Sequence, residues 1–371
     1  MIYYTVLKEI SPFKKPFHII RAILAKYFLV FTSKTVIGVT GSVGKTTTTN
    51  TICNALGSQA ISTVNNLDSI FNIPITILKS HRYRYLVLEM GVQYPQDMEH
   101  NVSVAPVDIA VFTKISPAHT KYLNNTKKIF EEKVKMVGPK TRLIVFNYDD
   151  QLQLQMFKNS KIRTISYGFS SGADVRISVK RSSLTQTIIR LESNDKKHII
   201  NSRLIGKHQT YSIGAAFAVG EYLKINRNQL ISNIEKTKPA NDRFNIVKIK
   251  KWYVIKDIYN SSPQALSDAI EFLTDQGQMH KVIIIGDMLE LGKISEQEHL
   301  KIARLLQGSK INEIFTYGKE SKKIHEFLLN HHSNSRLVHL TKPFKISNQK
   351  FPPNALILIK GSHGMHMENF F

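Results

Sequence analysis

The segment VIGVTGSVGKTTTT at residues 36–49 constrains the fold of this chain more than any other. An apolar, β-type run over Thr35–Val39 stops at a glycine-containing loop, and a helical pattern then covers Thr47–Leu56. A strand, a glycine loop and a helix in this order surround phosphate with backbone N–H groups and a helix N-terminus. The segment therefore predicts a nucleotide-phosphate site.

Two side chains of this loop have expected partners. The Lys45 ammonium reaches the β- and γ-phosphates, and the Thr46 hydroxyl is a ligand of Mg²⁺. The spacing differs from the usual Walker pattern, because Val39 stands where its first glycine belongs and the glycine falls at Gly41. The residues expected to bind the nucleotide here are Thr40, Gly41, Ser42, Val43, Gly44, Lys45, Thr46 and Thr47.

Length and composition fit an enzyme of the cytoplasm. The chain has 371 residues, enough for two or three domains. Its single cysteine, Cys53, excludes a disulfide framework. The chain has 51 Lys and Arg residues against 28 Asp and Glu, which gives a net charge of +23. This charge indicates either anionic partners, such as nucleotides, nucleotide-linked substrates or acidic lipids, or a proteome that is rich in lysine. The lysines are spread along the chain without a basic-aromatic patch, so nucleic-acid binding is disfavoured.

The N-terminal segment has two interpretations. Residues Phe17–Phe31, FHIIRAILAKYFLVF, are apolar but short for a membrane span and interrupted by Arg21 and Lys26. No small-residue cleavage site follows, which disfavours a secretory signal. The segment is either a helix packed against the first domain, or an amphipathic helix that meets an anionic membrane or a partner protein. Its basic residues are Lys8, Lys14, Lys15, Arg21 and Lys26.

Strand-like runs alternate with helical patterns along the rest of the chain, which is typical of parallel α/β sheets. The expected strands are Tyr85–Leu88, Ile109–Phe112, Leu143–Phe146, Val175–Val179, Thr187–Leu191, Tyr253–Ile255, Val282–Ile285, Glu313–Thr316 and Leu356–Ile359, with a helix at Thr210–Leu223. The linker-like KTKPAN at residues 236–241 separates two series. We therefore expect a basic amphipathic segment (1–33), a P-loop ATP-binding domain with a mostly parallel sheet (34–238) and a Rossmann-like α/β domain (239–371).

Nine short motifs occur in an order that resembles the Mur ligase family. They are TGSVGKTT at 40–47, EMG at 89–91, SPAH at 116–119, EEK at 131–133, GKH at 206–208, DRF at 242–244, DIYNSSP at 257–263, GDMLELG at 286–292 and KGS at 360–362. The resemblance covers roughly residues 35–371. The last three motifs most resemble the branch of the family that adds D-alanyl-D-alanine to UDP-N-acetylmuramoyl-tripeptide.

The resemblance implies an ATP-dependent ligase of peptidoglycan precursor synthesis, with UDP-N-acetylmuramoyl-tripeptide and D-alanyl-D-alanine as substrates. A carboxylate is a poor acyl donor, so the γ-phosphoryl group of ATP first converts it to an acyl phosphate, which the amine then attacks. The protein must neutralise the charge of the phosphates and align three reactants. ATP and two Mg²⁺ ions are the implied cofactors.

The resemblance also implies residue roles. Thr46 and Glu89 hold one Mg²⁺. His119 and Lys133 serve a second, with Lys133 carbamoylated because an ammonium cannot be a metal ligand. Arg243 reaches the γ-phosphate. The implied catalytic set is Lys45, His119, Lys133 and Arg243, and His208, Arg243, Asp257 and Asn260 join the nucleotide-binding residues.

Each of these side chains has a structural alternative. Glu89 can be a surface carboxylate, His119 a structural histidine, Lys133 a charge on a solvated helix, His208 a core or capping residue, Arg243 a linker charge and Asn260 a helix cap. Glu290 and His299 are interpreted as surface residues of the second domain and stay outside the site.

The chain also departs from the family pattern. The segment before Thr35 is too short for the domain that binds the UDP-sugar in the family. Residues 66–74 correspond to an asparagine-rich motif of the family but lack the asparagine pair and the glycine of that motif. Lys114, Asp242 and His363 stand where asparagine, glycine and arginine are usual. Two other functions therefore stay open: an amide ligase of the folylpolyglutamate or cyanophycin type, and a non-catalytic ATP-binding scaffold.

Overall fold

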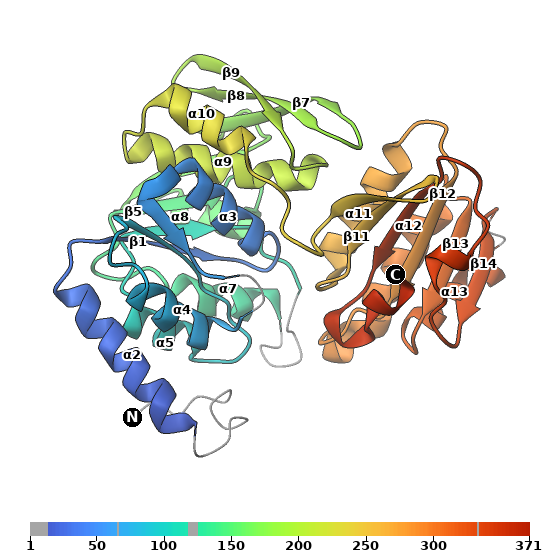
Figure 1. Cartoon of the computed structure of the whole chain (residues 1–371), viewed down its shortest axis with the longest axis horizontal. Coiled ribbons are helices and arrows are strands. Elements are labelled where there is room, and N and C mark those ends of the chain that lie inside the picture. Colours follow the sequence, from blue (N-terminus) through green and yellow to red (C-terminus); the bar gives the residue numbers. More distant parts are fainter. Residues whose placement is uncertain (1–13, 65–66, 118–124, 332–333) are drawn as a thin grey trace. The chain divides into compact units, whose positions relative to one another are not determined.

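The computed structural model of the chain describes residues 14–64, 67–117, 125–331 and 334–371 (Figure 1). The chain divides into two compact units, with the main boundary between Lys238 and Pro239. Each unit has its own sheet.

The first unit contains a nine-stranded sheet in the order β2-β3-β1-β4-β5-β6-β7-β8-β9. Strands β2 to β7 of this order pair in parallel, and β7, β8 and β9 pair antiparallel. The strands are β1 Thr35–Thr40, β2 Ala60–Ser62, β3 Tyr85–Glu89, β4 Ile109–Phe112, β5 Leu143–Asn147, β6 Arg163–Gly168, β7 Val175–Ser182, β8 Thr187–Ser193 and β9 Lys196–Ser202. The central strands are buried along nearly their whole length, because helices cover both faces of a parallel sheet.

Helices pack on both faces of this sheet. One face carries α3 Lys45–Ala55, α9 Lys207–Tyr222 and α10 Arg227–Glu235, with the short 3-10 turn η1 Gly57–Gln59. The other carries α2 Lys15–Val30, α4 Ser69–Leu78, α5 Asp97–Val104, α7 Thr126–Val134 and α8 Gln151–Phe157. Alternate residues of β1 join the two cores: Ile37 and Val39 face the first group of helices, and Val36 faces the second.

The second unit contains a six-stranded sheet in the order β10-β11-β15-β12-β13-β14, in which only β10 and β11 pair antiparallel. Its strands are β10 Asn245–Ile249, β11 Trp252–Asp257, β12 Lys281–Gly286, β13 Glu313–Tyr317, β14 Arg336–Leu340 and β15 Leu356–Lys360. Its helices are α11 Pro263–Asp275, α12 Ser295–Gln307 and α13 Ser321–Asn330, and its 3-10 turns are η2 Gly292–Ile294, η3 Ile346–Asn348, η4 His363–Met365 and η5 Met367–Phe370.

The neighbouring strands β12 and β15 lead to opposite faces of the second sheet. After β12 the chain enters α12, which packs beside α11 and α13. After β15 it enters η5, where Met367 and Phe370 join the core that covers the other face. The carboxyl ends of β12 and β15 therefore form a topological switch point, the usual position of ligands in open α/β sheets.

The predicted fold class is confirmed, and each expected strand is present. Five strands, β2, β6, β9, β10 and β14, were not among those expected. Strand β2 has only three residues, and the other four mix polar with apolar residues. The two predicted helices begin earlier than expected, α3 at Lys45 and α9 at Lys207.

The apolar N-terminal run forms α2, whose Ala25 is fully buried in the first unit. Among the described residues, no helix has the length and apolar character needed to cross a membrane.

Candidate active site

The loop between β1 and α3 depends on its glycines. Gly41 has φ 148°, and a Cβ there would lie 1.9 Å from the Thr113 hydroxyl. Gly44, at the N-cap of α3, has φ 84°, a left-handed conformation that favours glycine. The N–H groups of Ser42 and Val43 donate to the Lys114 carbonyl at 2.9 and 3.3 Å, which ties the loop to the segment after β4. The loop and the N-terminus of α3 thus lie at the carboxyl edge of the sheet.

Thr46 and Glu89 meet at this edge. Strand β3, which ends at Glu89, pairs with β1, and the Thr46 hydroxyl donates to Glu89 Oε2 at 2.7 Å. The backbone of Glu89 is also fixed, since its N–H donates to Thr63 and its carbonyl accepts from Ser69. The two side-chain oxygens therefore have a defined position next to the phosphate loop.

Lys133 belongs to the same site. It lies in α7 with 1% of its surface exposed, so a charge on a solvated helix is the wrong interpretation. Burial holds the pKa of Lys133 well below its usual value, and the nearby Lys45 ammonium lowers it further. Glu132, Asp97 and Glu89 act in the opposite direction. Lys45, Glu89 and Lys133 are thus close enough to interact electrostatically.

Two carboxylates beside Lys133 escaped the sequence analysis. Asp97 accepts hydrogen bonds from the N–H groups of Gln93 and Tyr94 at 2.9 and 2.8 Å, while burial raises its pKa. Glu132 accepts from the N–H of Gln96 at 2.8 Å. The Asp97 bonds hold the turn before α5, and the Glu132 bond fixes that turn against α7. In the sequence, Glu132 is marked only by its position in the EEK motif, and Asp97 belongs to none of the nine motifs.

The oxygen ligands of this site suit Mg²⁺. Within the described ranges, no three His, Cys, Asp or Glu side chains converge as a metal site would need. Mg²⁺ binds through one or two protein oxygens and keeps water or phosphate oxygens for the rest of its shell. Thr46 and Glu89 fit that requirement. The expected ligand His119 lies outside the described residues.

Three other predicted residues of the first unit lie at the ends of β1, α3 and α9. The Thr40 hydroxyl donates to the Met90 carbonyl at 2.8 Å. Thr47 lies in the first turn of α3, where its carbonyl accepts from Thr51. His208 lies half-buried in the first turn of α9, a helix that packs along α3.

Arg243 lies in the second unit on the face of Tyr259, with its guanidinium carbon 3.8 Å from the ring centroid. Its neighbours Asp242 and Phe244 have left-handed φ values of 60° and 53°, which are strained for such residues. The turn is held because the N–H groups of Ile258 and Tyr259 donate to the Asp242 carbonyl. This arrangement fixes the start of the Arg243 side chain.

Asp257 forms a buried ion pair. Its Oδ2 lies 2.6 Å from Nζ of Lys360, a side chain only 1% exposed, and its Oδ1 accepts from the N–H of Phe244. Lys360 also donates to the Asn260 carbonyl at 2.9 Å. The N-cap of α11 is Ser262, so the interpretation of Asn260 as a helix cap is wrong.

Three motifs of the second unit, DIYNSSP, GDMLELG and KGS, meet at its switch point. The Ser362 hydroxyl accepts from the N–H of Leu289 at 2.9 Å, and the Ser362 N–H donates to the Asp287 carbonyl at 3.1 Å. Ser362 also donates to the Ser261 carbonyl at 3.4 Å. The segments after β11, β12 and β15 are thereby joined into one surface at the carboxyl edge of the sheet.

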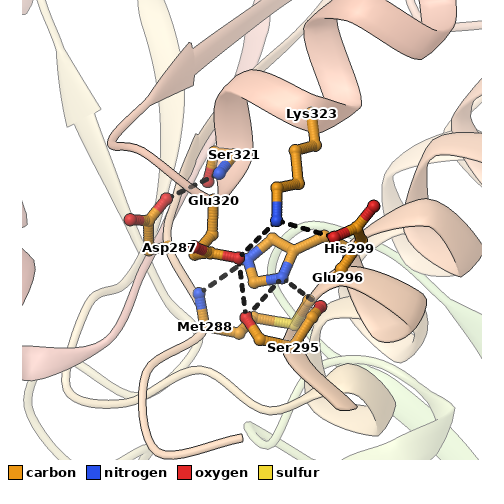
Figure 2. A network of polar contacts seen from close by, with 8 residues as sticks. All are labelled: Asp287, Met288, Ser295, Glu296, His299, Glu320, Ser321 and Lys323. Atoms are coloured by element: carbon orange, nitrogen blue, oxygen red, sulfur yellow. Dashed lines mark hydrogen bonds and ion pairs between the residues drawn. The ribbon is translucent and has the colours of Figure 1, made fainter. Parts of the chain in front are cut away.

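His299 fixes the segment after β12 (Figure 2). Its Nε2 accepts from the N–H of Met288 at 3.1 Å, and its Nδ1 donates to the Ser295 carbonyl at 2.7 Å, which defines a neutral ring. Burial lowers the pKa of His299, and the side chain is 0% exposed, so its interpretation as a surface residue is wrong.

Glu290 is exposed, as expected. A cavity of about 400 Å³ borders this segment, lined by Met288–Lys293, Ser295, Glu296, Glu320 and Lys323.

The two units match two domains of one family. Residues 39–220 match the Mur ligase middle domain, and residues 242–363 match the "Mur ligase, glutamate ligase domain". A Bacillus subtilis protein named UDP-N-acetylmuramoyl-tripeptide–D-alanyl-D-alanine ligase is 31% identical over 355 residues, which are 93% of this chain and 77% of that protein. This chain belongs to the Mur ligase family.

Further relatives of this Mur ligase carry the same name. The Rickettsia prowazekii protein is 26% identical over 345 residues, 90% of this chain and 76% of that protein. The crystal structure of MurF ligase from Thermotoga maritima in complex with ADP superposes with a TM-score of 0.84 at 25% identity, covering 95% of this chain and 82% of that one. The family predicted from nine ordered motifs is thus confirmed.

Proposed function

We propose that this Mur ligase joins D-alanyl-D-alanine to UDP-N-acetylmuramoyl-tripeptide in an ATP-dependent reaction of peptidoglycan precursor synthesis. The observation that carries the proposal is the contact of Thr46 with Glu89 beside a phosphate loop that ends in Lys45. The names of the Bacillus subtilis and Rickettsia prowazekii relatives support the choice of substrates.

The site residues divide the work of phosphoryl transfer. Lys45 binds the β- and γ-phosphates of ATP, and the loop residues 40–47 enclose them. Thr46 and Glu89 would hold Mg²⁺, which would neutralise charge on the phosphate oxygens. Arg243, His208, Asp257 and Asn260 contact the nucleotide. The tripeptide carboxylate takes the γ-phosphoryl group of ATP and ADP leaves. The amine of D-alanyl-D-alanine then attacks the acyl phosphate, a C–N bond forms, and phosphate and a proton leave.

Lys133 is proposed to be carbamoylated and, with His119, to serve a second Mg²⁺. Its lowered pKa favours the neutral amine, which is the form that attacks the carbon of CO₂. A C–N bond forms and the nitrogen loses a proton to solvent, so the neutral amine becomes an anionic carbamate. The Lys45 cation nearby offsets the cost of burying that new charge.

The two family matches support a separate role for each domain of the chain. Residues 34–238 are proposed as the central ATP-binding domain and 239–371 as the C-terminal ligase domain. A location in the cytoplasm follows from the substrates and fits the single cysteine.

A phosphate-release assay tests the function. Purified protein is incubated with ATP, Mg²⁺, UDP-N-acetylmuramoyl-tripeptide and D-alanyl-D-alanine, and each component is omitted in turn. We expect release only in the complete mixture. Release with glutamate in place of the dipeptide would favour a ligase of the folylpolyglutamate type, and no release from any mixture would favour a non-catalytic scaffold.

A further inference from the structure

The outward face of α2 is apolar. Helical spacing directs Ala22, Ala25, Phe28 and Leu29 towards the core of the first unit, where they are buried or partly buried. The opposite face carries large hydrophobic side chains that are 48% to 84% exposed: Phe17, Ile19, Ile20, Ile23, Leu24, Tyr27, Val30 and Phe31. These eight are half of the sixteen exposed large hydrophobic side chains in the described part of the chain. A helix that is apolar on both faces normally has both faces covered.

This face is held firmly in position. Helix α2 packs against α4 and α5 at the periphery of the first unit (Figure 1). The His18 ring lies 4.6 Å from that of Phe71 in α4. Just after the helix, Nζ of Lys34 donates to the carbonyls of Ser80 and Tyr83, each at 2.6 Å. The exposed side chains therefore form a fixed surface, which we call the α2 face, and contiguous apolar surfaces of this kind mark interaction sites.

The charged residues of the segment that carries the α2 face are all positive. Residues 14–31 contain Lys14, Lys15, Arg21 and Lys26 and no Asp or Glu. Lys26 is exposed, and the Arg21 guanidinium lies 4.8 Å from the centroid of the Phe17 ring. A second copy of the chain would present the same positive charges to this face, because a two-fold interface is self-complementary. An anionic surface satisfies both the apolar and the cationic groups.

The helix is shorter than the hydrocarbon core of a bilayer is thick. Its 16 residues extend about 24 Å, less than the roughly 30 Å of a hydrocarbon core. Side chains such as Phe17 and Tyr27 can enter the headgroup region while the lysines contact lipid phosphates.

We propose that the α2 face binds the surface of an anionic membrane and holds the protein there peripherally. The inference stands apart from the ligase activity, since none of its residues belongs to the candidate active site. For a chain that acts on nucleotide-linked precursors, the consequence is that its product is released beside the membrane.

Co-sedimentation of the full chain with phosphatidylcholine vesicles, with and without phosphatidylglycerol, tests the proposal. We expect binding to the anionic vesicles only, weakening with salt. Ile23→Ser with Tyr27→Ser should abolish it. Leu305→Ser with Leu329→Ser, which alters residues that are 41% and 54% exposed in the second unit, should leave it unchanged.

A second pair of variants tests the charges. Lys14→Gln with Lys26→Gln should weaken binding about 25-fold, because each basic residue at an anionic surface contributes roughly fivefold. Lys196→Gln with Lys197→Gln removes two exposed charges elsewhere and should change binding little. Circular dichroism and thermal unfolding establish that every variant is folded.

Three outcomes would overturn the proposal. One is no binding of the folded wild-type chain to anionic vesicles at low salt. Another is binding that the α2 variants and their controls reduce equally, which would indicate attraction by net charge alone. The third is a concentration-dependent dimer that Ile23→Ser with Tyr27→Ser dissociates while vesicle binding is absent, which would place a second copy on the α2 face.

Discussion

The buried pair of Asp257 and Lys360 yields an asymmetric prediction. The two residues end neighbouring strands and are register partners, with Oδ2 and Nζ 2.6 Å apart. Lys360 is 1% exposed, whereas Asp257 is 14% exposed and accepts a second hydrogen bond from Phe244. Loss of the carboxylate therefore leaves a deeply buried ammonium with the Asn260 carbonyl, while loss of the lysine leaves a carboxylate that water and an N–H group can reach.

The difference in burial sets the expected change in the free energy of unfolding for each variant. Asp257→Asn should lower the free energy of unfolding by about 4 kcal/mol, the usual cost of a buried charge that loses its partner. Lys360→Met should cost about 2 kcal/mol, because the remaining carboxylate is partly solvated. The double variant should cost about 3 kcal/mol, which makes the two substitutions strongly non-additive.

The chain contains its own reporter for the measurement. Trp252 is the single tryptophan of the sequence and lies 5% exposed in β11, where its Nε1 donates to the Phe351 carbonyl. Its fluorescence therefore follows the unfolding of the second unit in urea. With a slope of about 2 kcal/mol per molar urea, Asp257→Asn should lower the midpoint by about 2 M.

A matched surface pair provides the control. Lys322 and Glu326 are 3.7 Å apart and 58% and 56% exposed, so Glu326→Gln should change the free energy of unfolding by less than about 0.5 kcal/mol. Equal costs for Asp257→Asn and Lys360→Met, or a double variant whose cost equals the sum of the two, would refute the reasoning from burial.

Three further predictions concern the candidate site. Lys45→Ala should leave urea unfolding unchanged and abolish phosphate release; normal product formation would contradict the proposed mechanism. Lys133→Ala should be nearly inactive and partly rescued by a short-chain carboxylate, whereas full activity without it would exclude a required carbamate. The pKa of His299 is lowered from 6.5, so its stabilising effect is complete above about pH 6.5 and is lost as the pH falls. His299→Gln should therefore reduce the acid destabilisation measured by Trp252 fluorescence, and an unchanged pH dependence would count against a buried neutral ring.

The sequence by itself determined the α/β class, the position of most strands and the family. Strands β1, β3, β4 and β5 were predictable because their apolar runs are continuous, as burial between two helical layers requires. The phosphate loop was predictable because the glycines at 41 and 44 serve local backbone geometry. These features depend on neighbours in the sequence.

Only the tertiary structure decided the environment of individual side chains. Lys133 reads as one more charge in an EEK triplet, yet packing of α7 leaves it 1% exposed. Lys360 pairs with Asp257 across 103 positions of sequence, and His299 supports a segment that precedes its own helix. The apolar run of α2 likewise has one buried and one open face. Burial and charge pairing arise from contacts between distant segments, and the pattern of neighbouring residues carries no record of those contacts.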